Sequence, residues 1–491
     1  MANSLTKQTF IGFFWQFGGT VFKTILQLGV LAILARLISK EDFGVVQSAL
    51  IVLGLAKLIS QMGVGPALVQ SKNLTNLHIR AGTTLTLVLS ILLFLLVFIS
   101  SGVVADFFRM PSLIEVIRVV AIIFILEGAT TVSQSLLLRQ MKQKILVQID
   151  FVSYVIGYGV VAVILSYYGF GLWSLIAGQI IQSLLKCILS FIKCPHSIKP
   201  YWGKKEINEL MYFGGGFTVA RLFNYIANEG DNIITGRYLG SGALGVYSRA
   251  YSIMVKPVNL IGNSIDKVLF PSMAARQNQP DRLTEAFVNG SKMITFLCIP
   301  ISCIILFSSK EIINVMLGAQ WMESVVPLQI LTAGLIFRMG YKMGDCLTRA
   351  TGNVYSRASR QFLYAICVLL GCYIGSFWGI NGVAMGTLFA VFVNYILMIH
   401  LSLVILKSSW LYFLKRISTE LPISILLSLL FLIIITLIRL LFQNDGLILL
   451  FSYALFGGIS MLLFYFYSHK LSFIKLLPFE KILKKITKNN N

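Results

Sequence analysis

Fourteen apolar runs divide this chain of 491 residues, and each is about as long as a helix that crosses a bilayer. A crossing helix needs roughly 20 apolar residues because the hydrocarbon core is about 30 Å thick. The linkers are short, and the longest, from Lys193 to about Asn208, cannot hold a folded extramembrane domain. We therefore predict an all-α integral membrane protein. The predicted spans lie near residues 10–35, 43–66, 80–101, 114–138, 146–167, 170–192, 209–236, 244–270, 286–308, 324–348, 360–377, 381–406, 417–441 and 446–468.

The composition agrees with a bilayer as the solvent, and the distribution of charge orients the chain in it. Hydrophobic residues make up 57% and charged residues only 12%, yet the net charge is +22. Of the Lys and Arg residues, 24 fall in linkers on the side of the two termini and six in the opposite linkers. Such an asymmetry is typical of cytoplasmic loops, so we predict that both termini are cytoplasmic. The basic tail from Lys481 to Lys488 suits anionic lipid, and no nucleic-acid-binding module is legible.

Several kinds of chemistry find no support in the sequence. The seven cysteines form no CxxC pair and are read as small core residues, and the four histidines lack metal-ligand spacing. No GxxxxGK[ST] loop occurs, so ATP is not bound in the P-loop manner. We expect no cofactor, no metal and no catalytic residue. The first apolar run, which has no credible cleavage site, is interpreted as a retained span.

Eleven basic residues lie inside predicted spans, where each charge costs at least about 2.5 kcal/mol at the bilayer centre. Four of them, Lys186, Lys267, Lys292 and Arg439, are close enough to an interface to reach water with their side chains. In span 10, Arg338, Lys342, Asp345 and Arg349 form a stripe that either lines a cavity or is internally salt-bridged.

The remaining polar residues line up on helical faces. Residues 221, 224, 228 and 231 recur on one face of span 7, and residues 249 and 256 follow the same period in span 8. Lipid cannot satisfy such stripes, so they face protein or water. We predict a wet, net-positive cavity that suits a phosphate joined to a hydroxyl-rich group. The candidate substrate-binding residues are Lys23, Gln27, Lys57, Arg221, Asn224, Asn228, Arg249 and Lys256.

An internal repeat is visible at an offset of 201 residues. Residues 21–50 and 222–251 match at eight of thirty positions without a gap, including Arg36 with Arg237 and Gly44 with Gly245. Both stretches cross the membrane in the same direction, which indicates parallel six-helix repeats related by an axis along the membrane normal. The predicted parts are an N-terminal lobe (1–200), a C-terminal lobe (201–410), two additional spans (411–470) and a basic tail (471–491).

Three local patterns resemble the polysaccharide transporter family. They are Leu34-Ala35-Arg36-Leu37-Ile38 followed by Glu41-Asp42-Phe43-Gly44, then Leu136-Leu137-Leu138-Arg139-Gln140-Met141-Lys142, and Tyr247-Ser248-Arg249-Ala250-Tyr251 running to Leu269-Phe270-Pro271. The chain looks most like the WzxC-like O-antigen and colanic-acid exporters of the multidrug/oligosaccharidyl-lipid/polysaccharide flippase superfamily. The resemblance implies a flippase of the inner membrane that moves undecaprenyl-pyrophosphate-linked repeat units, and not an enzyme.

The resemblance also implies an ion gradient as the energy source. Asp231 and Glu229, on the stripe of span 7, are the preferred candidates for the proton or sodium site, followed by Glu127. They could instead pair with Arg221 or Arg237. The expected partners are the lipid-linked oligosaccharide, membrane lipid and a coupling ion, with the chain a monomer and a polysaccharide polymerase a candidate associate.

Two other functions remain open at this point. A drug or cation antiporter of the same superfamily would need an anionic cavity, which the excess of Lys and Arg on the stripes disfavours. A membrane polysaccharide polymerase or ligase would need substantial outer loops. The outer loops here are short, and the region from Val104 to Val116 holds no obvious catalytic set.

Overall fold

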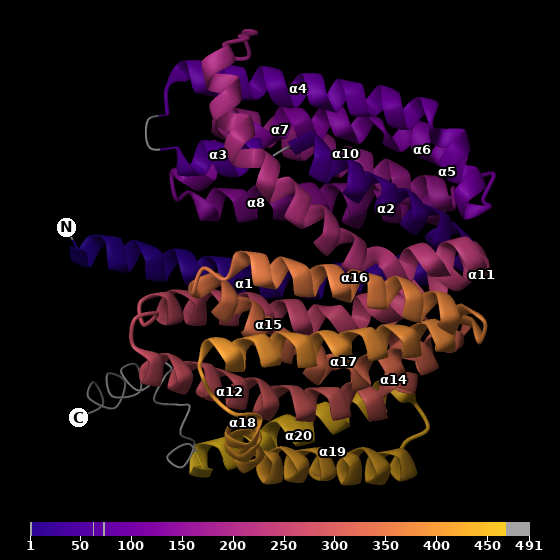
Figure 1. Ribbon diagram of the computed structural model, residues 1–491. Coiled ribbons are helices and arrows are strands. Elements are labelled where there is room, and N and C mark those ends of the chain that lie inside the picture. Colours follow the sequence, from indigo (N-terminus) through magenta and orange to yellow (C-terminus); the bar gives the residue numbers. More distant parts are fainter. Residues whose placement is uncertain (1, 62, 72–73, 468–491) are drawn as a thin grey trace. The chain divides into compact units, whose positions relative to one another are not determined.

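The computed structural model describes residues 2–61, 63–71 and 74–467, and these residues are helical almost throughout, with no strand among them (Figure 1). They divide into two compact units. The first unit holds the chain up to Arg249 together with residues 316–321 and 368–386, and the second holds the rest. The prediction of an all-α membrane protein is confirmed.

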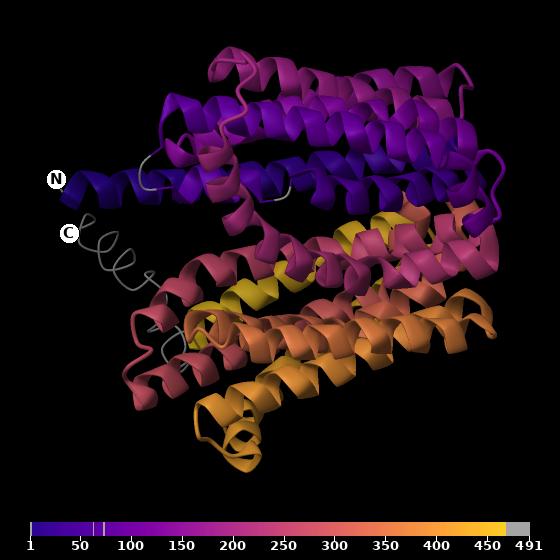
Figure 2. The same cartoon turned by 45° about the horizontal axis from the view of Figure 1, so that its top comes forward.

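The first unit contains eleven complete helical elements. They are α1 (Ala2–Leu37), α2 (Lys40–Gln61), α3 (Val64–Gln70), α4 (Asn76–Ile99), α5 (Ser101–Phe108), α6 (Leu113–Val120), α7 (Ile122–Arg139), α8 (Gln143–Tyr154), the π-helix η1 (Val155–Ala162), α9 (Val163–Tyr167) and α10 (Leu172–Lys193). Within this unit α7 packs against α3, α4 and α10, and α10 packs against α8 and η1 (Figure 2). Their apolar contacts include Leu68, Ala81 and Leu137, which are fully buried.

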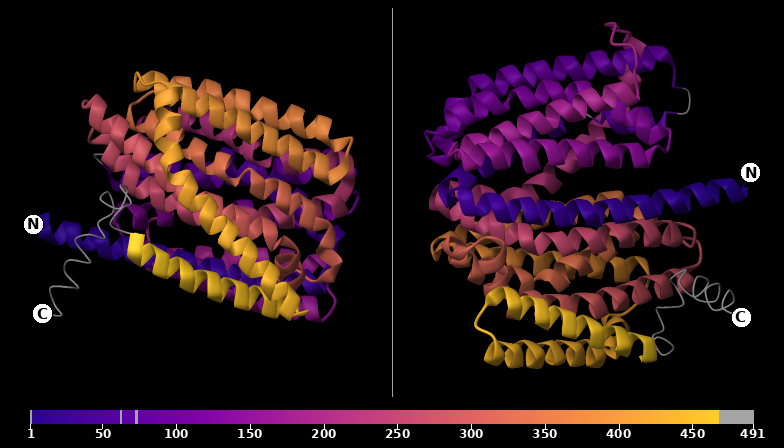
Figure 3. Two further views of the ribbon diagram at one scale, coloured as in Figure 1. Left: turned by 90° about the horizontal axis from the view of Figure 1, so that it is seen from below. Right: turned by 180° about the vertical axis from the view of Figure 1, so that it is seen from behind.

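The second unit is built around α12. Its elements are α12 (Pro280–Phe307), α13 (Ser309–Met316), the 3-10 turn η2 (Ala319–Ser324), α14 (Val325–Ala333), α15 (Leu335–Ala350), α16 (Val354–Ser376), α17 (Gly379–Ile405), α18 (Trp410–Ile417), the 3-10 turn η3 (Ser418–Glu420), α19 (Leu421–Leu441) and α20 (Asp445–Tyr467); parts of α13, η2, α16 and α17 belong to the first unit. The last two helices, drawn in yellow in Figure 3, pack side by side, and α19 also packs on α12.

One 71-residue element, α11 (Lys204–Ala274), joins the two units and contains two predicted spans. It is broken at Gly240, which has φ 86° and ψ −178°. This backbone conformation is essentially restricted to glycine. The break lies inside the linker predicted between residues 236 and 244.

Where the structure describes them, the residues of the predicted spans lie mainly on helices. Within residues 2–61, 63–71 and 74–467, seven helices are long and apolar enough to cross a membrane, or eight if a pair bent by 42° between α14 and α15 is one span. The chain is therefore a multi-pass membrane protein, whereas fourteen crossings stays a prediction. The bounds of the two lobes also stay a prediction, because the compact units are divided at a different position.

The predicted repeat has a counterpart in a reciprocal close contact inside the first unit. A side chain at Gly44 would overlap the carbonyl group of Ser241, and one at Gly245 would overlap that of Lys40. Residue 241 is the repeat partner of residue 40, as 245 is of 44. Two copies of one segment related by a two-fold axis meet in this way, each offering the same surface to the other.

The interpretation of Lys292 as a residue that reaches for water is wrong. Lys292 is 5% exposed and its Nζ lies 3.7 Å from Oε1 of Glu420. A buried charge requires a partner. The side chain of Arg439 is 39% exposed, which agrees with a residue that reaches for water, and its Nη2 also lies 2.7 Å from Oε1 of the buried Glu311. Each pair joins α12 or α13 to the α19 region. The side chain of Lys267 lies outside the described residues.

Candidate functional site

Lys23 lies on α1 and contacts a carboxylate of α8. Its Nζ is 3.7 Å from Oδ2 of Asp150, and the same carboxylate is 3.2 Å from Nζ of Lys186 on α10. The rings of Phe22 and Phe151, each next to one of the charged residues, lie 5.4 Å apart and hold the two helices together at this point. Gln27 follows Lys23 by one helical turn and is partly buried.

Lys57 on α2 forms the tightest ion pair among the predicted site residues. Its Nζ is 2.8 Å from Oε2 of Glu127 on α7. Nearby on the same face of α2, the hydroxyl of Tyr225 donates to the carbonyl of Ile51 at 2.8 Å, and Gly54 leaves room for that ring. This packing brings α11 against α2.

Arg249 is held by neutral groups of α2. Its Nη2 donates to Oε1 of Gln47 at 3.3 Å, and its guanidinium lies 4.8 Å from the centre of the Phe43 ring. This geometry suits a cation–π contact.

The predicted stripe on the first half of α11 divides into an amide pair and an acidic group. The side-chain amide of Asn228 donates to both the carbonyl and the Oδ1 of Asn224, at 2.7 and 2.8 Å. Asp231, only 2% exposed, accepts from the hydroxyl of Tyr247 at 2.8 Å. Glu229 accepts from Nδ2 of Asn232 at 2.9 Å. The side chain of Arg221 lies outside the described residues.

Arg237 has different partners from the ones considered in the sequence. It donates to the carbonyl of Asp106 at 3.0 Å and to that of Phe107, at the end of α5, and it stacks on the Phe107 ring. These contacts close the end of a helix whose carbonyls otherwise lack donors.

The polar residues of the second unit form a separate group. Lys256 belongs to this unit and is partly buried. On α15, Asp345 pairs with Arg349 at 3.0 Å and with Arg357, while Arg338 donates to the hydroxyl of Tyr251 at 2.7 Å. The salt-bridged interpretation of this stripe is therefore correct in kind, with Arg349 and Arg357 as the partners of Asp345.

Two residues of the Lys23 cluster, Asp150 and Lys186, were not among the predicted site residues. Lys186 was interpreted as a residue that reaches for water, whereas it contacts Asp150. A signal was present in the sequence. Asp150 lies four residues inside the start of span 5 and Lys186 six residues inside the end of span 6, on the same predicted side. Consecutive spans run in opposite directions, so the two residues reach a similar depth.

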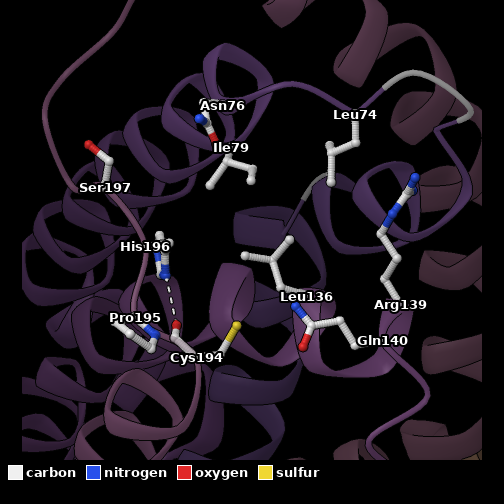
Figure 4. A pocket seen from close by; sticks show the side chains of 10 residues that line it. All are labelled: Leu74, Asn76, Ile79, Leu136, Arg139, Gln140, Cys194, Pro195, His196 and Ser197. Atoms are coloured by element: carbon white, nitrogen blue, oxygen red, sulfur yellow. Dashed lines mark hydrogen bonds between the residues drawn. The ribbon is translucent and has the colours of Figure 1, made fainter.

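A pocket of about 450 Å³ lies at the predicted cytoplasmic end of the first unit, where α4 begins and α7 and α10 end (Figure 4). Leu74, Ile79 and Leu136 form its apolar wall. Arg139 lines it too, but donates through Nη1 to three carbonyls at the end of α3 and so serves as a cap of that helix. None of the predicted substrate-binding residues lines this pocket.

On the opposite wall of the pocket, the His196 Nδ1 lies 3.3 Å from the Cys194 carbonyl oxygen (Figure 4). Burial lowers the pKa of His196, and the carbonyl of Cys194 acts against this effect. His196 is therefore biased toward its neutral form.

Comparisons with known proteins agree with this architecture. Residues 33–326 match the family described as polysaccharide biosynthesis protein. The chain is 27% identical over 372 residues to the teichuronic acid biosynthesis protein TuaB of Bacillus subtilis (strain 168), covering 75% of each chain. It is 23% identical over 400 residues to the lipopolysaccharide biosynthesis protein WzxC of Escherichia coli (strain K12), covering 80% of each.

Among solved structures, the fold is similar to that of the lipid II flippase MurJ in its inward closed conformation. The TM-score is 0.72 at 19% identity, covering 93% of this chain and 99% of that one. The family match extends over more than half of the chain and includes all three local patterns. The chain belongs to the polysaccharide biosynthesis protein family.

Proposed function

We propose that this protein is a flippase for undecaprenyl-pyrophosphate-linked oligosaccharides. It moves repeat units of an O-antigen or exopolysaccharide from the cytoplasmic to the periplasmic leaflet of a bacterial inner membrane, with both termini in the cytoplasm. Family membership supports the class of pathway, and the similarity to MurJ supports a fold that can work by alternating access.

The observation that carries the proposal is the presence of cations on several spans of the first unit. Lys23, Lys57 and Arg249 lie on α1, α2 and α11, and they contact an amide and an aromatic ring as well as carboxylates. Lys and Arg bind phosphate oxygens strongly, and the amides of Asn224 and Asn228 suit sugar hydroxyls. The polyprenyl tail can stay in lipid while the head group crosses.

The acidic pair on α11 is the proposed site of ion coupling. Asp231 is buried and bound to Tyr247, and Glu229, which directly follows Asn228 of the amide pair, is bound to Asn232. A carboxylate inside a membrane protein is a candidate for an ion pathway. The proposal assigns no catalytic residue. The protein is proposed to be a monomer that can associate with a polysaccharide polymerase.

The test is complementation of a bacterial strain that lacks its own repeat-unit flippase. We expect Lys23→Ala and Arg221→Ala each to impair export of the polysaccharide while the protein still inserts in the membrane. Lys193→Ala, which removes an exposed charge at the end of α10, is the matched control and is expected to export normally. Normal surface polysaccharide in both site variants would contradict the proposed roles.

A further inference from the structure

The cluster of Lys23, Asp150 and Lys186 places two ammonium groups on one carboxylate. The three residues come from α1, α8 and α10, and their side chains are 27%, 37% and 21% exposed. The two Nζ atoms approach different oxygens of Asp150, at 3.7 and 3.2 Å. Both distances exceed the 2.7–2.9 Å typical of a strong charge-assisted hydrogen bond. The carboxylate therefore holds both lysines loosely.

The cluster has one more positive charge than a structural pair requires. Lys292 with Glu420 and Arg439 with Glu311 show how this protein builds an ion pair that joins helices: one cation, one carboxylate, and a carboxylate only 7% or 4% exposed. Asp150 is far more accessible than either. A surplus charge on membrane spans is costly, so the second lysine calls for a ligand outside the resting structure.

Two of the helices that carry the cluster, α10 and the helix formed by α8 and η1, pack closely just beyond it. The chain packs η1 on α10 so closely that a Cβ at Gly157 would lie 2.6 Å from the carbonyl oxygen of Gly178. The hydroxyl of Tyr158 donates to Oε1 of Gln179 at 2.7 Å. The π-helix itself begins five residues after Asp150, and π-helical turns are frequent at functional sites. The helices that carry Asp150 and Lys186 are thus held close together, whereas the long distances from the carboxylate to the two ammonium groups leave these groups able to exchange partners.

We propose that Asp150 stands in for the phosphate of the cargo. In the empty protein it holds Lys23 and Lys186 in position, and the diphosphate of the lipid-linked cargo displaces it and binds both lysines. Lys186 is thus a substrate-binding residue and Asp150 a competing internal anion that promotes release. This inference rests on the proposed function. It predicts that removing the Asp150 carboxylate strengthens the binding of the cargo, whereas the loss of a purely structural ion pair would not.

The direction of this change in affinity is measured with the purified full-length chain in lipid nanodiscs. The probe is undecaprenyl diphosphate, with undecaprenol as the uncharged lipid and inorganic pyrophosphate as the free anion. We expect Asp150→Asn to tighten binding of undecaprenyl diphosphate about fivefold, the factor that corresponds to one partly exposed ion pair. Lys186→Ala is expected to weaken it by as much as Lys23→Ala does. The affinity for undecaprenol is expected to be the same in all variants. The affinities for pyrophosphate are expected to rank the variants in the same order as those for undecaprenyl diphosphate, at lower values.

Two control variants make the same changes in charge elsewhere in the first unit. Glu209→Gln removes an exposed carboxylate bound to His78, and Lys193→Ala removes an exposed lysine of α10. Both are expected to leave affinity within about twofold of wild type. If Asp150→Asn does not fold because the lysines repel, Lys186→Gln is compared with the double variant Asp150→Asn/Lys186→Gln, and the double variant is expected to bind more tightly.

The outcomes separate the inference from the function on which it rests. Weaker or unchanged binding after loss of the Asp150 carboxylate, in a protein that does bind undecaprenyl diphosphate, overturns the inference and leaves the flippase standing. A wild-type chain that binds undecaprenol and undecaprenyl diphosphate equally overturns both.

Discussion

Replacing Gly44 or Gly245 by alanine tests whether the two repeats meet at one reciprocal contact. A Cβ at Gly44 would lie 2.5 Å from the carbonyl carbon of Ser241, about 0.9 Å short of the 3.4 Å at which ordinary contact begins. A Cβ at Gly245 would lie 2.9 Å from the carbonyl carbon of Lys40. Both neighbours are backbone atoms, so a helix must move rather than a side chain.

The expected cost follows from these distances. Overpacking of this kind costs about 1–3 kcal/mol, and the better helix propensity of alanine returns up to about 1 kcal/mol. Each variant should therefore be up to about 2 kcal/mol less stable than wild type, and about 1–3 kcal/mol less stable than a variant that gains the helix propensity without the overlap. Gly29→Ala is the matched control, because nothing lies within 4 Å of its Cβ position. It should be neutral or slightly stabilising.

The assay is thermal unfolding of the purified protein, followed with a dye that fluoresces when it reacts with thiols. The chain carries its own reporters, since Cys298, Cys346 and Cys372 are free and buried. We expect Gly44→Ala and Gly245→Ala to unfold at lower temperature than Gly29→Ala. The double variant should lose less stability than the two single losses added, because helices already separated by one methyl group have room for the other. Equal melting of Gly44→Ala and Gly29→Ala, or strict additivity, would refute the reciprocal contact.

Two further predictions concern stability. Glu311→Gln weakens the ion pair with Arg439 that joins α13 to α19. The variant should be about 2 kcal/mol less stable and should therefore melt at a lower temperature. An unchanged melting temperature would show that the pair contributes nothing to stability. His196 has a pKa lowered by burial, so the unfolded chain binds its proton more readily than the folded one. Stability is therefore lost as the pH falls through the pKa of His196 in the unfolded chain, near 6.5. Between pH 7.5 and 5.5, the His196→Gln variant should lose less stability than wild type. An equal loss in both proteins would contradict this assignment.

The periodicity of apolar residues was sufficient to locate the helices. Each run of about 20 apolar residues became helical, because a membrane span must satisfy its backbone internally. The break at Gly240 lies in the linker that the apolar runs predict between residues 236 and 244, although the runs do not single out this residue. The π-helix at 155–162 was not, because its residues are apolar throughout and a change of helical register leaves no mark in composition.

Partners of the charged residues were harder to predict than the helices. A stripe shows which face of a helix is polar, but not which neighbouring helix that face meets. Lys57 and Lys23 were expected to exceed the available carboxylates, yet each contacts one, Glu127 and Asp150 respectively. At Asp150, one carboxylate serves two lysines, Lys23 and Lys186.

The charges on the spans of the first unit set the sign of any coupling between ion and cargo. Five cations are opposed by four carboxylates in the interior of these spans: Lys23, Lys57, Lys186, Arg221 and Arg249 against Glu127, Asp150, Glu229 and Asp231. A proton or sodium ion bound at Asp231 or Glu229 adds positive charge, and so strengthens the binding of an anionic cargo; by reciprocity the cargo strengthens the binding of the ion. Export of the cargo against inward flow of the cation needs the opposite, since the two must occupy the protein in turn. Under the proposed function, direct charge competition at Asp231 therefore has the wrong sign. The coupling then has to act through a change of conformation rather than through direct charge competition.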